Sequence, residues 1–518
     1  MKTIKHILSI VAVSALLASC IGDLNVTPID PNISTADKVL TSEEAFTAYL
    51  AGVYTGFATS GYYGANGSAS ISGLDGGASQ YIRGLYHHSE LTTDESVCGW
   101  NDQTIKNFHW MNWTTDDTFI YAFYSRIFMQ VSAANEFIRE AQASNLAFSG
   151  KEELIAEARV LRAIAYFHAI DNFGNVPFAD ETSVVGSFPE QIKRADLFEW
   201  LESELKDLIN NSALAAPRGN GFARADKGVA KFLLAKLYLN AEVYTGTPRW
   251  NDCATVLNSL MSDGYSLHTS SAGTYSAYQE LFLADNNRCT DEIIFAIEQD
   301  GINTTSYGAT NYIIFASTIA SNEKMDPDEI GISSGWSGLR TTPEFYSLFS
   351  KSDDRYLFQT EGQQESIDDI GDATNGFAFK KFLNRTSDGG YGQEKGFVDT
   401  DFPMMRYADV LLMAAECAAR GANIDGLTAF NQVRARAGMP AANGLSLNDI
   451  LDERGRELYQ ECWRRSDLIR FGVFTSGYNW QWKGNVKEGK DVESHRTLFP
   501  IPDSDRLANT GLEQNPGY

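Results

Sequence analysis

Apolar side chains recur with the period of an amphipathic helix over three parts of the chain, residues 41–59, 116–263 and 403–475. In each part they return every three or four residues, which places them on one face of a helix. The pattern therefore predicts a mostly α-helical scaffold. Individual helices are expected at residues 42–55, 117–143, 151–172, 196–211, 227–245, 250–263, 425–437 and 447–471, and another is expected to begin at Pro403.

Neighbouring helices of this scaffold form pairs. The segments 151–172 and 196–211 are one pair, and the segments 227–245 and 250–263 are another. Small residues such as Ala158 and Ala165 occupy the faces that pack, and the pattern repeats at intervals of roughly 30–40 residues. Such pairs are typical of tetratricopeptide-like helical hairpins.

Two long segments, residues 60–115 and 264–402, interrupt the helical pattern. They are rich in glycine and serine, and neither a helical nor a strand period is sustained, apart from one apolar run at 292–297 that predicts a buried strand. We expect long, ordered loops here. Loops held by a rigid scaffold commonly carry binding groups, so the ligand face is predicted on these two insertions of a single domain covering 41–518.

The N-terminus has the features of a bacterial lipoprotein signal. Lys2 and Lys5 precede the apolar run 7–17, and the run ends at Leu17-Ala18-Ser19-Cys20. We expect residues 1–19 to be removed, Cys20 to carry lipid, and residues 20–40 to form a tether. The alternative is an ordinary secretory signal with a chance cysteine. Acyl chains would hold the protein on a membrane without a spanning helix.

The net charge and the cysteine content disfavour several classes of binding partner. The chain has 67 acidic and 42 basic residues, a net charge of −25, which disfavours binding to nucleic acid or to anionic headgroups. No apolar run of spanning length follows residue 20, so membrane attachment is expected through the lipid anchor only. The other five cysteines are not spaced as metal ligands, and Cys253, Cys417 and Cys462 are expected within helices as buried small hydrophobes.

Several motifs together resemble a known family. They lie in order at residues 156–167, 173–177, 406–412, 431–438, 453–468, 498–502 and 514–518. These stretches are similar to the SusD-like (SusD/RagB) family of surface glycan-binding lipoproteins from Bacteroidetes. One departure is Cys462, where the family usually has glycine; we expect it in the middle of a helix, where the change is tolerated.

Further stretches, at 90–95, 224–227, 237–246 and 480–484, are similar to the family's starch-binding founding member. The resemblance implies about four tetratricopeptide-like units that support an irregular binding face. It also implies a role at the surface of the outer membrane, where the protein would cap a SusC-like TonB-dependent barrel and deliver oligosaccharides to it.

Candidate sugar-binding residues are aromatics on the insertions with polar groups close by, because aromatic rings stack on the C–H faces of sugars and polar side chains bind the hydroxyls. They are Asp75, Arg83, Trp100, Gln103, Tyr307 and Trp336. By resemblance, Tyr307 and Trp336 match two members of an aromatic arc, Asp75 and Arg83 match polar contacts, and Gln103 stands where the relative has Asn. The third arc position falls on Cys98, which cannot stack; Trp100 is the candidate to replace it. The alternative for each aromatic is loop packing.

Metal-binding candidates are few. Asp399 and Asp401, with Asn287 or Asp285, could ligate a hard cation such as structural Ca²⁺, and the resemblance implies calcium at a similar acidic pair. The alternative is that Asp401 only caps a helix at Pro403. His87 and His88 are interpreted as ordinary loop histidines.

The sequence favours a binding protein over an enzyme. A glycoside hydrolase needs two suitably spaced carboxyl groups, and the only local hint is Asp94-Glu95 in a loop. Glu457, Glu461 and Arg465 are interpreted as an ion-pair ladder on an exposed helix face. We expect no catalytic cofactor and an α-glucan ligand such as starch, maltooligosaccharide or dextran; the alternatives are levan, a β-glycan or a peptide.

Overall fold

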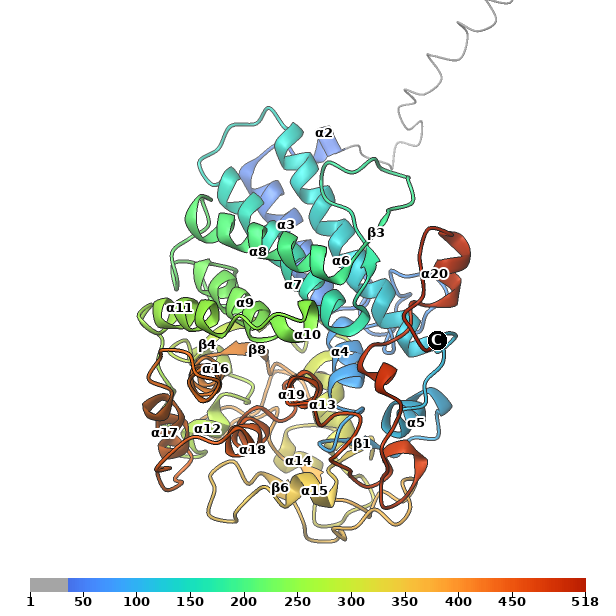
Figure 1. Ribbon diagram of the computed structural model, residues 1–518, viewed down its shortest axis with the longest axis vertical. Helices are drawn as coiled ribbons and strands as arrows, with labels where there is room; N and C mark the ends of the chain where they lie inside the picture. Colours follow the sequence, from blue (N-terminus) through green and yellow to red (C-terminus); the bar gives the residue numbers. More distant parts are fainter. Residues whose placement is uncertain (1–35) are drawn as a thin grey trace, which may run out of the picture.

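The computed structural model describes residues 36–518, so the predicted signal peptide, Cys20 and most of the tether lie outside it. A run of paired helices fills the upper part of Figure 1, and the second insertion lies below it. These helices are α3 (Glu43–Ala58), α6 (Thr118–Ala143), α7 (Lys151–Phe173), α8 (Arg194–Asn210), α9 (Lys227–Leu239), α10 (Ala241–Thr245) and α11 (Trp250–Met261). From α3 to α9 each helix packs on the next, and α11 packs on α9, as the hairpin prediction requires.

The sequence places these helices well because their ends are set by local chemistry. The side chains of Ser42, Asp117 and Asp226 accept hydrogen bonds from the first-turn N–H groups of α3, α6 and α9. One prediction needs correction. The helix expected at 227–245 is interrupted at Asn240, which separates α9 from α10.

The C-terminal helices differ more from the prediction. Strand β8 (Phe402–Arg406) contains Pro403, so the helix begins later, as α16 (Tyr407–Ala419). The helix α17 (Gly426–Arg436) agrees with its prediction. The helix expected at 447–471 is instead two helices, α18 (Leu447–Leu458) and α19 (Arg464–Arg470).

Cys462 lies in the break between α18 and α19. Its φ is +68°, in the left-handed region that favours glycine, and Gln460 has a φ of +60°. The expectation that Cys462 sits mid-helix was therefore wrong. Glycine adopts such a left-handed backbone conformation without steric cost, so it suits this position. In this chain the side chain of Cys462 is buried at the turn.

The first insertion is less irregular than predicted. It contains α4 (Tyr81–Ser89) and α5 (Gln103–Trp110), so the expectation of continuous loops over 60–115 was wrong there. In the second insertion the expected buried strand is β4 (Ile293–Ile297), which pairs antiparallel with β8. Insertion and scaffold are thus joined by a sheet.

The remaining elements are short. The strands pair antiparallel as β1 with β5, β2 with β3 and β6 with β7. The bounds are β1 Val97–Cys98, β2 Val176–Pro177, β3 Gln191–Ile192, β5 Leu339–Arg340, β6 Phe358–Gln359, β7 Ala378–Phe379, α2 Ala36–Val39, α12 Ala277–Glu280, α13 Ala309–Ser317, α14 Pro327–Ile330, α15 Pro343–Tyr346, α20 Asp503–Ala508, and the 3-10 helices η1 Asn286–Arg288, η2 Lys483–Asn485 and η3 Ser494–Thr497.

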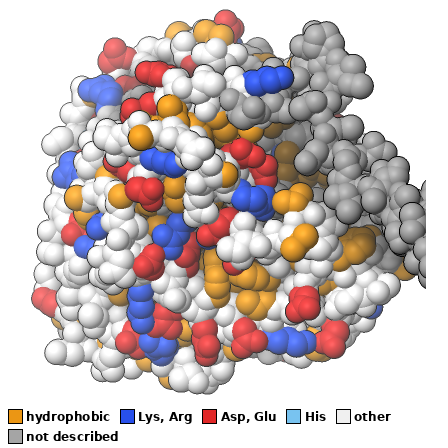
Figure 2. Space-filling view, turned by 90° about the horizontal axis from the view of Figure 1, so that it is seen from above, with side chains coloured by type: hydrophobic (Ala, Val, Ile, Leu, Met, Phe, Trp, Pro, Cys, Tyr) orange, Lys and Arg blue, Asp and Glu red, His pale blue; other side chains and the backbone are white. Residues whose placement is uncertain are grey.

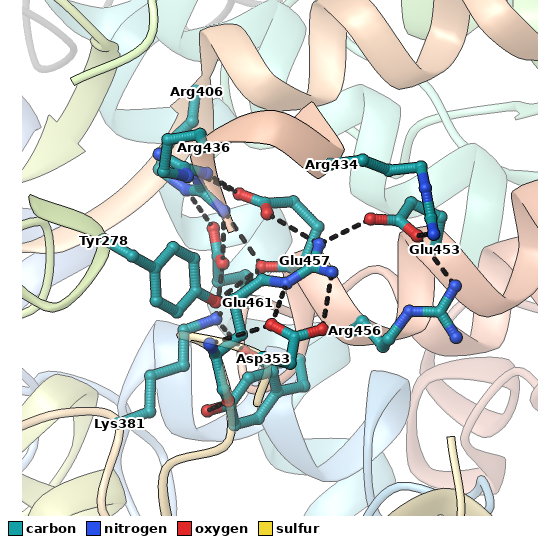
Figure 3. Close-up of polar contacts among 12 residues, drawn as sticks. Tyr278, Asp353, Lys381, Arg406, Arg434, Arg436, Glu453, Arg456, Glu457 and Glu461 are labelled. Atoms are coloured by element: carbon teal, nitrogen blue, oxygen red, sulfur yellow. Dashed lines mark hydrogen bonds and ion pairs between the residues drawn. The ribbon is translucent and has the colours of Figure 1, made fainter. Parts of the chain in front are cut away.

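A buried ion-pair cluster connects the second insertion to α18 (Figure 3). Glu457 on α18 binds Arg355 of the insertion at 3.2 Å and Arg406 of β8 at 3.1 Å, and it also pairs with Arg436 of α17. Glu461 binds Lys381 of the insertion at 2.6 Å. The exposed ladder predicted here was wrong, because these side chains are buried.

Arg465, the third member of the predicted ladder, contacts neither glutamate. It points to the other side, where its guanidinium lies 3.4 Å from the carboxylate of Asp171 and donates to the carbonyl of Thr497 at 2.6 Å.

The surface at the end that carries α2, α3 and α8 has charges of both signs interspersed with small apolar areas (Figure 2). Acidic and basic side chains are thus mixed on this face. Within residues 36–518, no helix combines the length and the apolar character needed to cross a membrane.

Candidate functional site

Gln80 holds together the elements that carry the candidate residues. Its amide oxygen accepts from the backbone N–H groups of Arg83 at 2.8 Å and Ala309 at 2.9 Å, and its amide nitrogen donates to the carbonyl of Phe57 at 2.6 Å. It therefore caps α4 and fixes the start of α13 next to it, against the end of α3. As a result, Arg83 of α4 and Tyr307, just before α13, lie side by side.

Three aromatic side chains form a continuous surface beside this junction. The ring centroids of Trp100 and Trp336 are 6.3 Å apart at an interplanar angle of 48°, and those of Trp336 and Tyr307 are 6.1 Å apart at 57°. All three are only partly buried. Since each ring is tilted by about half a right angle against the next, the surface is curved. We call these three residues the aromatic arc.

The loop that carries Trp336 is fixed by backbone hydrogen bonds to the end of α13. The backbone N–H of Trp336 donates to the carbonyl of Phe315 at 2.7 Å, and that of Gly338 donates to the carbonyl of Ala316 at 2.7 Å. A Cβ atom on Gly338 would lie 2.9 Å from the Trp100 ring, so glycine is needed for that ring to pack here. The Trp100 indole N–H in turn donates to the Trp336 carbonyl at 2.9 Å. The arc is thus held in place without a ligand.

The polar candidates Arg83 and Asp75 lie at the edge of the arc. The Arg83 guanidinium stands 5.5 Å from the Trp100 ring centroid and donates to the Tyr307 carbonyl at 3.3 Å. Burial lowers the pKa of Arg83, and the nearby acidic groups, Asp75 among them, oppose that shift. Asp75 is exposed, and its carboxylate accepts from the N–H of Ala78 at 2.9 Å.

Gln103 is the one sugar-site candidate that the structure does not bring into contact with the others. It begins α5, is exposed, and donates to Asn107 at 2.8 Å. Cys98 in strand β1 is only 2% exposed, and burial raises its pKa to about 11. A ligand cannot reach it, whereas Trp100, two residues on, reaches the surface.

Sequence reasoning missed the residues that support the arc. Phe315 packs against Trp336 at 4.9 Å and Phe397 against Tyr307 at 5.6 Å, while Asn66 accepts from the Tyr307 hydroxyl at 2.9 Å. Phe315 lies on a fully buried helix, and Asn66 lies in a glycine-rich loop with many similar polar residues. Neither has a local pattern that could have selected it.

The metal candidates Asn287, Asp399 and Asp401 line one polar cavity of about 510 Å³, together with Glu298 and Asp300. Asp401 is buried and accepts from the N–H of Gln299 at 2.7 Å, so it does not cap the following helix, which was the alternative. Burial raises the pKa of Asp401 well above its usual range, and Glu298 and Asp399 add to the shift. Over residues 36–518, no three His, Cys, Asp or Glu side chains are arranged to hold a metal ion.

His87 and His88 are buried on α4, packed among aromatic rings, so describing them as loop histidines was wrong. Burial lowers the pKa of His87 well below its usual range and that of His88 to about 3, which keeps both neutral.

The acidic pair on which the hydrolase alternative depended is inaccessible. Asp94 is fully buried, and its two carboxylate oxygens accept from Arg464 at 2.8 and 2.7 Å. Glu95 is fully buried as well and accepts from the N–H of Gln460 at 2.6 Å. Neither group can reach a glycosidic bond in solution.

The scaffold of helical hairpins thus carries a fixed aromatic arc that faces solvent, and such a surface suits ligands with flat apolar faces. Comparison with known proteins gives the family. The model of the SusD family matches residues 357–518. The whole chain is 30% identical to the starch-binding protein SusD of Bacteroides thetaiotaomicron and covers 99% of it. The chain therefore belongs to the SusD family.

Other relatives and solved structures agree on the fold. A SusD-like protein of Bacteroides ovatus is 24% identical over 76% of this chain and 80% of its own. Surface glycan-binding protein A from Bacteroides thetaiotaomicron, in complex with laminarihexaose, superposes with a TM-score of 0.69 over 92% of this chain and all of its own, at 18% identity. A laminarin-binding SusD-like protein superposes with a TM-score of 0.68 over the same shares, at 21% identity.

Proposed function

We propose that this protein is a lipid-anchored glycan-binding protein of the cell surface. It captures an α-glucan such as starch or dextran and delivers it to a SusC-like TonB-dependent barrel in the outer membrane. Cys20 carries the anchor. The aromatic arc, with Arg83 and Asp75 at its edge, supports the proposal that the protein binds a glycan. Membership of the SusD family supports the proposal of a barrel partner.

The curvature of the arc is the observation that carries the choice of ligand. Successive interplanar angles of 48° and 57° suit a ligand that curls, as α-glucans do, better than a flat, extended chain. The starch-binding relative supports the same choice. A β-glucan such as laminarin is the second candidate, because proteins with this fold bind it. Levan and peptides remain as further alternatives.

Replacing Trp336 by alanine is expected to weaken glycan binding roughly tenfold or more, because Trp336 contacts both other rings of the arc and stacks at its centre. The measurement is affinity electrophoresis of residues 21–518 through gels that contain amylopectin, dextran, laminarin, levan, xyloglucan or no polysaccharide. Phe188→Ala is the control, since Phe188 is 69% exposed on the scaffold and away from the arc.

The results of this experiment test the choice of ligand and the position of the site separately. Retardation by amylopectin or dextran alone supports an α-glucan. Retardation only by laminarin, levan or xyloglucan keeps the glycan-binding role and rejects the α-glucan. A Trp336→Ala variant that folds normally and binds as tightly as Phe188→Ala would show that the arc is not the site.

We also propose that Asp401, Asp399 and Asn287 hold a structural Ca²⁺. Support comes from their shared polar cavity and from Asp401, a buried carboxyl whose neighbours Glu298 and Asp399 are also acidic. Oxygen donors of this kind suit a hard cation, which would relieve the repulsion once the side chains close around it.

Calcium is therefore expected to stabilise the native protein against unfolding, by about 3 kcal/mol at one hundred times its dissociation constant. Thermal unfolding in the presence of Ca²⁺, of Mg²⁺ or of a chelator measures this stabilisation. The Asp401→Asn variant should lose the calcium response and keep its fold. An equal response in both proteins would place any bound calcium elsewhere.

A further inference from the structure

A second cavity, of about 460 Å³, lies wholly within the second insertion, and none of its lining residues belongs to the aromatic arc. Its walls include two tyrosines, Tyr275 and Tyr356, and three charged side chains, Glu329, Lys380 and Arg385. Aromatic faces beside hydroxyl-binding polar groups are the same chemistry that marks the first site. The volume falls in the range of small-molecule binding sites.

The floor of this cavity is rigid. It lies at the β6–β7 sheet, where Lys380 N–H donates to the carbonyl of Leu357 at 2.8 Å. The ring of Tyr356 packs 5.6 Å from that of Phe358, and its hydroxyl is hydrogen-bonded to that of Tyr346. A ligand would therefore meet a preformed aromatic wall and would not have to order it.

Arg385 is fixed by backbone carbonyls, and no carboxylate of residues 36–518 forms an ion pair with it. Its guanidinium donates to the carbonyls of Gly389, of Gly390 at 2.7 Å and of Asp328 at 3.1 Å, and it lies 4.0 Å from the centroid of the Tyr391 ring. Such bonding sets its position at the cavity wall. The exposed carboxylate of Asp328 is close enough to interact with its charge but forms no ion pair with it within residues 36–518.

Three other polar groups are free to bind a ligand. Within residues 36–518, the Glu329 carboxylate, the Lys380 ammonium and the Tyr275 hydroxyl have no hydrogen-bond or ion-pair partner. Donors and acceptors are thus both present. Hydroxyl groups of a sugar both donate and accept hydrogen bonds, so such a mixed set of polar groups beside two tyrosine rings suits a polyhydroxylated ligand.

We propose that this cavity is a second glycan subsite, which binds a further stretch of the same polysaccharide that the arc holds. The inference rests on the proposed glycan-binding function. Ile330 lines the cavity and Trp336 belongs to the arc, so the six intervening peptide units limit their Cα separation to about 22 Å. A single polysaccharide can therefore span both, and linked binding raises the apparent affinity for long chains without changing that for short ones.

The test compares a long and a short ligand on the full-length chain in detergent. The cavity variant is Glu329→Ala with Lys380→Ala, which removes two side chains that line the cavity and form no hydrogen bond or ion pair within residues 36–518. The matched control is Glu365→Ala with Lys351→Ala, which removes two exposed charges of the same insertion. The probes are amylopectin and maltoheptaose, or laminarin and laminarihexaose if laminarin is the polysaccharide that retards the native protein.

We expect the cavity variant to bind the polysaccharide roughly 3- to 10-fold more weakly than the control variant. Titration calorimetry with the oligosaccharide should show two sites in the native protein, and one tight site in the cavity variant. In Trp336→Ala the weak site alone should remain.

Two results would overturn the inference: equal polysaccharide affinity of the cavity and control variants, or a single oligosaccharide site in the native protein. If instead the proposed glycan-binding function is wrong, no polysaccharide or oligosaccharide will bind the native protein, which distinguishes that result from the two above.

Discussion

Replacing Glu457 by alanine is expected to lower the free energy of unfolding by about 3–5 kcal/mol. The side chain is fully buried and pairs with three arginines, Arg355, Arg406 and Arg436. Its removal takes one counter-charge from each of three buried guanidinium groups (Figure 3). Each arginine keeps another carboxylate partner, as Arg355 does with Asp353 and Glu453. Burial alone would raise the pKa of Glu457, but the arginines hold it at about 2.

The direction of the pH effect follows from that pKa. Because the folded-state pKa lies below the unfolded value, the stabilisation by Glu457 is present above the usual carboxyl range and is lost as pH falls toward 2. Urea unfolding at pH 7 measures the main effect. Glu513→Ala is the control, since Glu513 forms an exposed pair with Lys193 worth about 0–1 kcal/mol. A loss for Glu457→Ala no larger than for this control would contradict the assigned role of the cluster.

The second large effect is expected at a buried pair of carboxyl groups, Glu90 and Glu95. Both are fully buried and face one another. Both carboxylate oxygens of Glu90 and one of Glu95 lack a hydrogen-bond partner within the part of the chain that the structure describes. Burial raises the pKa of Glu90 to about 8, and burial together with the charge of Glu90 raises that of Glu95 well above its usual range.

The protein should therefore lose stability as pH rises from about 5 to 8. Over that window the unfolded chain has released the proton of Glu90 and the folded chain still holds it, so raising the pH favours unfolding. The contribution of Glu90 is on the order of 4 kcal/mol over the window. Glu90→Gln keeps the shape of the neutral acid, so this variant should be more stable than the native protein at pH 8 and have a flatter pH profile.

Thermal or urea unfolding at several pH values measures the difference, with Glu513→Gln as an exposed control that should keep the native profile. If Glu90→Gln and the native protein lose the same free energy between pH 5 and pH 8, Glu90 is not protonated in the folded state.

The sequence predicted helices well where one face is buried and the other is in water. Helices α3, α6, α8 and α17 agree closely with their predicted ranges because an amphipathic period is a local signal, and α3, α6 and α17 also have a capping side chain. Helix α7 agrees as well, although nearly all of its residues are buried, because its apolar pattern is long. Helix α4 was missed because it has only 9 residues, too few to sustain a helical period, and most of them are buried. Strand β8, buried throughout, was likewise taken for the start of a helix.

For the site, the sequence selected side chains of suitable chemistry, and the structure decided which of them act together. Five of the six candidates, Asp75, Arg83, Trp100, Tyr307 and Trp336, gather at the junction of α4 and α13. Gln103 lies apart. Residue type and position in an irregular segment are visible in the sequence, whereas the angle between two rings is not.

The sequence by itself thus determined the helical scaffold, the position of the insertions and the kind of side chains at the candidate site, because these depend on local periodicity and residue chemistry. Only the tertiary structure decided the curvature of the aromatic arc, the burial of Glu90 and Glu95, the left-handed turn at Cys462 and the ion-pair cluster around Glu457. The arc, the buried acids and the ion-pair cluster each depend on residues that are distant in the chain and meet only when the insertions pack on each other and on the scaffold.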